Sequence, residues 1–137
     1  MLNENEILER LKPLLTEVLG VAPEKVLPGS VLVADLGAES IDLLDLSFRI
    51  EETFNVTIEG NEIELEASKR LPGGVYEKDG RLTDAALAEI RKSVPELDAS
   101  KLVSGMRKLD LPSLLTVQFF VRLISRKLNE KEGAVHA

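Results

Sequence analysis

The sequence contains no cysteine and no tryptophan, and its only histidine is His136. Without cysteine, the chain forms no disulfide and offers no thiolate to a metal ion or a substrate. No apolar run approaches the roughly 18 residues that a membrane-spanning helix needs. The first residues, MLNENEILER, are acidic and amphipathic, unlike a signal or transit peptide. These absences favour a cytoplasmic domain without a membrane span, with a core built from Leu, Ile and Val.

Acidic residues outnumber basic ones, and the excess lies in the first half of the chain. The formal net charge is −7, and residues 1–59 hold twelve acids and four bases. A nucleic-acid-binding surface needs clustered Lys and Arg, so no such partner is expected. Proteins with basic surfaces fit better, because complementary charge steers encounter. The alternative explanation is that the acidity only keeps the protein soluble.

Hydrophobic spacing predicts an all-α bundle of about four main helices, at residues 3–19, 40–53, 83–93 and 116–129. Asn3, Thr83 and Thr116 are the expected caps of the first, third and fourth. For the second helix, the periodicity predicts a wide apolar face formed by Ile41, Leu43, Leu44, Leu46, Phe48 and Ile50.

One proline and one glycine determine the middle and the end of the first helix. Pro13 predicts either one bent first helix or a second start near Lys12, and Gly20 is its expected stop. The tail KEGAVHA is expected to fray after the last helix.

Residues 60–113 carry weaker structural signals. Gly60-Asn61 predicts a two-residue hairpin turn that aligns Ile58 with Ile63, although a short helix from Asn61 is a rival. Asp79-Gly80 is a second, weaker turn signal. A further short helix is expected within residues 96–109.

Ser40 lies between two carboxylates in the stretch DLGAESIDLL, at the start of the second helix. It can be a helix cap, a nucleophile or a site of modification. A nucleophile needs a base, and His136 lies next to the end of the sequence. The acids around Ser40 lack the spacing of a calcium loop, and Gly73-Gly74 lacks the Lys and Ser or Thr of a phosphate loop. A hydrolase and a dedicated metal site are therefore not expected.

The stretch DLGAESIDLLDLSFRIEETFNVTI, residues 35–58, resembles the signature of acyl carrier proteins. In that family a serine carries a 4′-phosphopantetheine arm, donated from coenzyme A, whose thiol holds acyl groups as thioesters. The resemblance implies that Ser40 is the attachment site and that Asp35, Leu36, Gly37 and Glu39 form the motif loop. It also implies an acidic surface that meets basic patches on partner enzymes, formed by Glu39, Asp42, Asp45, Glu51 and Glu52.

The resemblance implies a monomeric carrier that is not an enzyme. Its partners would be a phosphopantetheinyl transferase and the acyl-transferring and chain-modifying enzymes of fatty acid or specialised lipid biosynthesis. A carrier of aminoacyl, peptidyl or polyketide groups is the nearest alternative. A helical interaction module in which Ser40 is an unmodified cap is an alternative of another class.

Three departures from the family pattern stand out. Glu39 occupies a place where the family usually has Asp, and Arg49 brings a cation into the acidic helix. The chain is expected to be a single acyl-carrier-like domain, residues 1–137, in which residues 60–113 are an insertion. The insertion either decorates the bundle or enlarges its pocket or docking surface. The family's short third helix would fall at residues 61–68 or 96–106.

Overall fold

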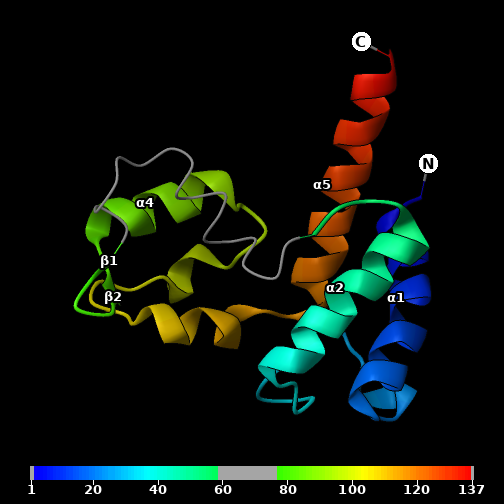
Figure 1. Cartoon of the computed structure of the whole chain (residues 1–137), viewed down its shortest axis with the longest axis horizontal. Coiled ribbons are helices and arrows are strands. Elements are labelled where there is room, and N and C mark those ends of the chain that lie inside the picture. Colours follow the sequence, from blue (N-terminus) through cyan, green and yellow to red (C-terminus); the bar gives the residue numbers. More distant parts are fainter. Residues whose placement is uncertain (1, 59–76, 137) are drawn as a thin grey trace. The chain divides into compact units, whose positions relative to one another are not determined.

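The computed structural model describes residues 2–58 and 77–136. The chain divides into two compact units (Figure 1). Unit 1 comprises Met1–Gly60 and Leu115–Ala137, and unit 2 is Asn61–Leu114. That the two units belong to one domain, with residues 60–113 as an insertion, stays a prediction.

The described residues are mainly helical, which confirms the predicted all-α class. Unit 1 contains α1 (Glu4–Leu19), a 3₁₀ turn (Pro23–Lys25), α2 (Ser40–Phe54) and α5 (Val117–His136). Unit 2 contains β1 (Glu77–Lys78), β2 (Arg81–Leu82), α4 (Asp84–Ser93) and 3₁₀ segments at Ala99–Lys101 and Lys108–Leu114. Within the described ranges, no helix combines the length and apolarity needed to cross a membrane.

The N-terminus of α1 has the predicted capping box. Asn3 Oδ1 accepts a hydrogen bond from Glu6 N at 2.9 Å, and Glu6 Oε1 accepts one from Asn3 N at 3.2 Å. Each contact satisfies a backbone N–H that the helix itself leaves without a partner. Pro13 does not divide the segment, since α1 runs through it as one helix. Gly20, at φ 67°, ends α1 as predicted.

Removing the Asn3 cap tests how much this box stabilises α1. We expect Asn3→Ala to lower the free energy of unfolding by about 0.5–2 kcal/mol in urea denaturation. Asn5→Ala is the matched control, because Asn5 is exposed inside the same helix. The control should leave stability within about 0.5 kcal/mol of the original. Equal losses in both variants would show that the box does not stabilise the helix.

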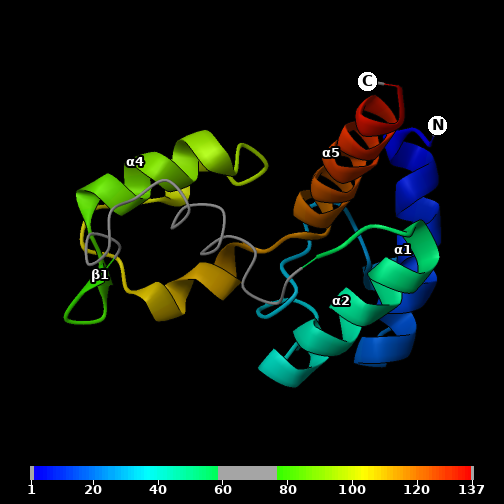
Figure 2. The ribbon, with the colours of Figure 1, turned by 45° about the horizontal axis from the view of Figure 1, so that its top comes forward.

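α1 contacts both α2 and α5, and the three helices form a bundle (Figure 2). The core consists of aliphatic and phenylalanine side chains, as expected for a sequence without Trp. α1 contributes Ile7, Leu11 and Leu15, which are fully buried at successive turns. α2 contributes Leu46, Ile50 and Phe54, and α5 contributes Val117, Phe120, Val121, Leu123 and Ile124.

α5 begins where predicted and ends later than predicted. Thr116 Oγ1 accepts a hydrogen bond from Phe119 N at 3.0 Å, which confirms the cap. The helix continues to His136 and does not stop near Asn129. The intervening residues are mostly good helix formers, so the backbone has no local reason to leave the helix. Lys131 Nζ also donates to Asn55 O at 2.9 Å, which holds α5 to the end of α2.

Unit 2 has a small apolar core of its own and a short hairpin. β1 and β2 pair antiparallel, with Lys78 opposite Arg81, around the Asp79-Gly80 turn. Asp79 and Gly80 both have positive φ, at 55° and 78°, as a type I′ turn requires. The weaker turn signal is thereby confirmed. The core residues are Leu82, Ala86, Leu87, Ile90, Val94, Leu97, Leu102, Met106 and Leu111.

Other predictions for the insertion have mixed outcomes. α4 begins after its predicted cap, since Thr83 accepts a hydrogen bond from Ala86 N at 3.1 Å. The prediction of a short α-helix within residues 96–109 is wrong, because that stretch contains 3₁₀ segments and no α-helix. The backbone there makes repeated i→i+3 contacts, such as Leu102 N to Ala99 O. The Gly60-Asn61 turn and the candidate helix at residues 61–68 lie outside the described residues.

Candidate functional site

Ser40 is the first residue of α2, and it is exposed. Glu39 takes the N-cap position before it, with extended backbone angles. Glu39 N donates to Asp42 Oδ2 at 2.9 Å, which satisfies one N–H at the start of the helix. The sequence left open whether Ser40 is itself the cap, and the structure places Glu39 there. The Ser40 hydroxyl is therefore presented at the helix start without the capping role.

The loop before Ser40 is held by backbone hydrogen bonds and one carboxylate. Asp35 Oδ2 accepts from Val31 N at 2.7 Å, and Asp35 N donates to Val31 O at 2.8 Å. Ala38 N donates to Leu32 O at 2.8 Å. Each of these contacts joins the DLGAES stretch to residues 31–32. Asp35 is therefore a residue that shapes the loop.

Alternate residues of this loop face the core and the solvent. Leu36 and Ala38 are buried, at 4% and 6% exposure, and Glu39 and Ser40 are exposed. Gly37 makes the turn between them at φ 73°, a left-handed angle that an L side chain adopts only at a cost. The two buried side chains fix the loop, so the position of Ser40 is set by packing.

The same loop is also joined to the segment that precedes α5. Leu32 N donates to Leu115 O at 2.9 Å, and Val117 N donates to Ser30 O at 3.0 Å. Val31 and Thr116 form an isolated antiparallel bridge. The hydrogen bonds of Leu32, one to Leu115 and one to Ala38, connect the start of α5 to the loop that carries Ser40. The sequence analysis did not anticipate this pairing.

The predicted partner-binding acids have different environments in the structure. Asp42 is half-buried and accepts the hydrogen bond from Glu39 N, while Glu51 Oε1 accepts a hydrogen bond from Ile58 N at 3.3 Å. Asp45 is ion-paired with Arg49. Glu39 and Glu52 are exposed. The carboxylates of Asp42, Asp45 and Glu51 therefore have structural contacts, and the partner-binding role of the set stays a prediction.

The predicted apolar face of α2 is only partly core, which corrects the sequence analysis. Ile41, Leu44 and Phe48 are 71%, 48% and 56% exposed, respectively. Leu46 and Ile50 are almost fully buried. At about 100° per residue, Leu44 and Leu46 are separated by about 200° around the helix, so one neighbour cannot cover both. We call Ile41, Leu44 and Phe48 the apolar stripe.

The apolar stripe is interleaved with acids. Positions 41, 45, 48 and 52 follow one another at helical spacing, so Asp45 and Glu52 share a face with Ile41 and Phe48. Contiguous exposed apolar side chains beside charges are typical of surfaces that bind another protein. The stripe begins at the residue after Ser40.

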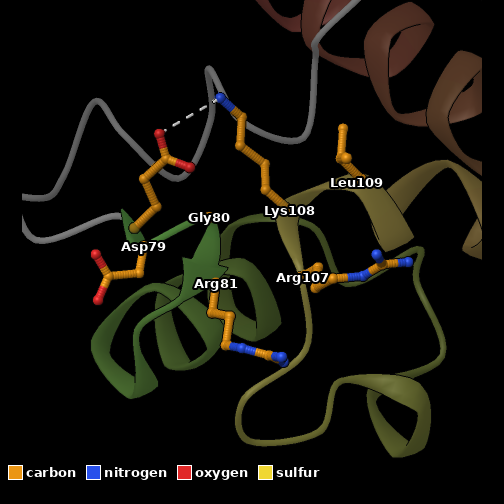
Figure 3. A pocket seen from close by; sticks show the side chains of 7 residues that line it. Asp79, Gly80, Arg81, Arg107, Lys108 and Leu109 are labelled. Atoms are coloured by element: carbon orange, nitrogen blue, oxygen red, sulfur yellow. Dashed lines mark ion pairs between the residues drawn. The ribbon is translucent and has the colours of Figure 1, made fainter.

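A hollow lies on unit 2, beside the hairpin turn (Figure 3). Its three cations have partners within the unit. Lys108 Nζ lies 3.8 Å from Glu77 Oε1, Arg81 donates to Gly105 O at 2.6 Å, and Arg107 lies 3.1 Å from Asp110. The Arg107 hydrogen bond lowers the pKa of Asp110. These cations already have partners, so the hollow is a weak candidate for an anion site.

The surroundings of Ser40 fit a phosphodiester. The hydroxyl is exposed at the N-terminus of a 15-residue helix. The helix dipole and the backbone N–H groups of a first turn both favour a negatively charged phosphate there. Among the described residues, no group of three or more His, Asp or Glu side chains is placed to hold a metal ion.

Comparison with known proteins identifies the class of protein to which this site belongs. Residues 9–68 match the family model described as the phosphopantetheine attachment site, and this range contains Ser40. The chain therefore contains a carrier domain whose prosthetic group is covalently bound 4′-phosphopantetheine.

Curated relatives identify the family within that class. The chain is 41% identical to an acyl carrier protein of Thermosynechococcus vestitus over 63 residues, 46% of this chain and 78% of the relative. It is 46% identical to one of Rhodopseudomonas palustris over 54 residues, 39% of this chain and 68% of the relative. It is 41% identical to one of Cyanidium caldarium over 58 residues, 42% of this chain and 67% of the relative. The chain belongs to the acyl carrier protein family.

Proposed function

We propose that Ser40 carries the 4′-phosphopantetheine arm and that the chain shuttles acyl groups between enzymes of fatty acid or specialised lipid biosynthesis. The observation that carries this proposal is the position of Ser40, exposed at the first residue of α2 after a loop held by Leu36, Ala38 and Asp35. A large enzyme can approach a hydroxyl in this position, and the helix N-terminus accommodates the phosphate.

The chain has the role of substrate and carrier in this proposal, and the catalysts are its partners. Ser40 Oγ loses its proton and bonds to the phosphorus atom of coenzyme A that bears the pantetheine. The P–O bond of the pyrophosphate breaks, and adenosine 3′,5′-bisphosphate leaves. Asp42 is engaged with Glu39 N, and His136 lies in the last part of α5, so we assign the base to the transferase. When bound, the arm supplies a thiol that holds an acyl group as a thioester.

The direct test is incubation of the full chain with coenzyme A and a broad-specificity phosphopantetheinyl transferase, followed by intact mass measurement. We expect each chain to gain the mass of one phosphopantetheine. An unchanged mass, under conditions in which a known acyl carrier protein is fully modified, would contradict the proposal. It would favour an unmodified interaction module.

We further propose that partner enzymes dock on the apolar stripe and the acids beside it. Ile41, Leu44 and Phe48 lose exposed apolar area when a partner covers them, and their burial then contributes to affinity. Exposed ion pairs around such a centre contribute only about 0–1 kcal/mol each. Weak, salt-sensitive binding of this kind suits a carrier that visits several enzymes.

Phe48→Ser tests the stripe. We expect the variant to raise the transferase's KM for the chain about tenfold, the effect of losing one buried aromatic contact. Thermal stability should change little, because Phe48 is 56% exposed. Leu109→Ser is the control, since Leu109 is 80% exposed and lies on unit 2. Equal KM values for Phe48→Ser and the unsubstituted chain would show that the stripe does not bind the transferase.

A further inference from the structure

Arg49 is the one base among the described residues of α2, and it is bound by two carboxylates. Its NH1 atom lies 3.1 Å from Glu17 Oε2 on α1, and its Nε atom lies 3.4 Å from Asp45 Oδ1 on α2. The hydrogen bond that Arg49 donates to Glu17 is the main cause of a raised pKa for Arg49, and Asp45 adds to it. An arginine guanidinium keeps its positive charge in proteins, so Arg49 is a permanent cation in this helix.

The carboxylate of Asp45 can be contacted both by Arg49 and by a docking enzyme. Its side chain is 52% exposed and lies on the same helical face as Ile41 and Phe48, so a docking enzyme can reach it. Arg49 is 34% exposed and already occupies one side of the carboxylate. A lysine or arginine that approaches Asp45 from a partner meets the positive charge of Arg49 at short range.

We propose that Arg49 is a specificity-determining residue that selects among partner enzymes by masking Asp45. Enzymes that place a cation opposite Asp45 bind less well, because the cation must compete with Arg49. Enzymes with a neutral or acidic side chain at that place bind without the penalty, and their cations meet exposed acids such as Glu39 and Glu52. The inference rests on the proposed function, because it concerns docking to the helix that begins at Ser40.

A purely structural role for Arg49 is the competing explanation, since its contact with Glu17 joins α2 to α1. The two explanations predict different results for stability and for KM. A structural link affects stability and has no reason to alter the KM of a partner in a salt-dependent way. Masking alters KM at low salt, and its effect disappears when salt screens the charges.

The test measures the KM and kcat of a broad-specificity phosphopantetheinyl transferase with a basic docking patch, using the full apo chain as substrate. Arg49→Gln should lower KM about three- to tenfold at low ionic strength, the effect of one or two exposed charge pairs. The kcat should be unchanged. The gain should vanish at about 0.5 M NaCl, where the Debye length is only a few ångströms.

Asp45→Asn, combined with Arg49→Gln, identifies the masked group. With Arg49 present, Asp45→Asn should change KM by less than about twofold, because the carboxylate is masked. With Arg49→Gln present, the same substitution should reverse most of the gain. This non-additivity is what the shared contact requires.

Two further variants separate masking from net charge and from folding. Arg122→Gln removes the same charge from an exposed position on α5 and should leave KM near its original value. Arg49→Lys keeps the positive charge and should retain the original KM. Thermal unfolding of all the variants shows whether a KM change is accompanied by loss of structure.

Equal KM values for the original chain and Arg49→Gln at low salt would overturn the inference. It would also be overturned if Asp45→Asn raised KM by the same factor in both backgrounds, because Asp45 would then be available already. Either result leaves the proposed function intact, since Ser40 would still receive its arm. Failure of the original chain to accept the arm would overturn both proposals.

Discussion

Ser40→Ala is expected to abolish transfer of phosphopantetheine to the chain completely. Ser40 is exposed at the first residue of α2, and the variant removes only the hydroxyl that forms the phosphodiester. Alanine is well tolerated in the first turn of a helix, and Glu39 provides the N-cap position, so the fold should be retained. Intact mass after incubation with coenzyme A and transferase measures the loss.

Ser47→Ala is the matched control on the same helix. Ser47 is 6% exposed, and its hydroxyl donates to Leu43 O at 3.0 Å, so a transferase cannot reach it. This variant should gain one phosphopantetheine, as the original chain does. A mass gain that survives Ser40→Ala would mean that another residue is the acceptor.

Leu32→Ala is expected to destabilise unit 1 by about 2–5 kcal/mol. Leu32 has no exposed surface, and its replacement leaves a cavity beneath the loop that precedes α2. The total stability of a domain is about 5–15 kcal/mol, so this loss is a large share. The backbone N–H of Ala38 donates to Leu32 O, and we expect its hydrogen exchange to become faster.

Val33→Ala is the control for Leu32→Ala, because it truncates the next residue of the same loop. Val33 is 36% exposed, so its truncation should cost less than about 1 kcal/mol. Urea unfolding followed by circular dichroism measures both variants. Equal losses for Leu32→Ala and Val33→Ala would show that packing of Leu32 does not hold the loop.

Local sequence patterns predict the helix ends because residues only a few positions apart in the sequence make the contacts that begin a helix. Asn3 with Glu6, and Thr116 before Phe119, satisfy helix N-termini through contacts three residues apart. The Asp79-Gly80 turn follows for a similar reason, since Gly80 adopts positive φ without strain. The motif around Ser40 is likewise contiguous in the sequence.

Long-range contacts of the site are not encoded in such patterns. The contact of Leu32 with Leu115 joins backbone atoms far apart in the chain, and any residue type can make it. The ion pair of Arg49 with Glu17 depends on how α1 packs against α2. Sequence alone shows Arg49 as an unusual cation, and only the packing shows which acids it binds.

The apolar stripe illustrates where periodicity is insufficient. Ile41, Leu44 and Phe48 have the spacing of a core face, and so do Leu46 and Ile50. Periodicity identifies both faces but does not state which one a neighbour covers. The position of α1 buries the second face and leaves the first exposed. The exposed face is the one that remains available for binding a partner.

The most direct measurement is fragment-ion mass spectrometry of the modified chain after trypsin digestion. Cleavage after Lys25 and Arg49 releases one peptide that contains Ser30, Ser40 and Ser47, so the fragment series must separate the three serines. We expect phosphopantetheine on Ser40 and on neither of the others. Modification of a different residue, or an unmodified peptide from a chain exposed to active transferase, would contradict the assignment of Ser40 as the attachment site.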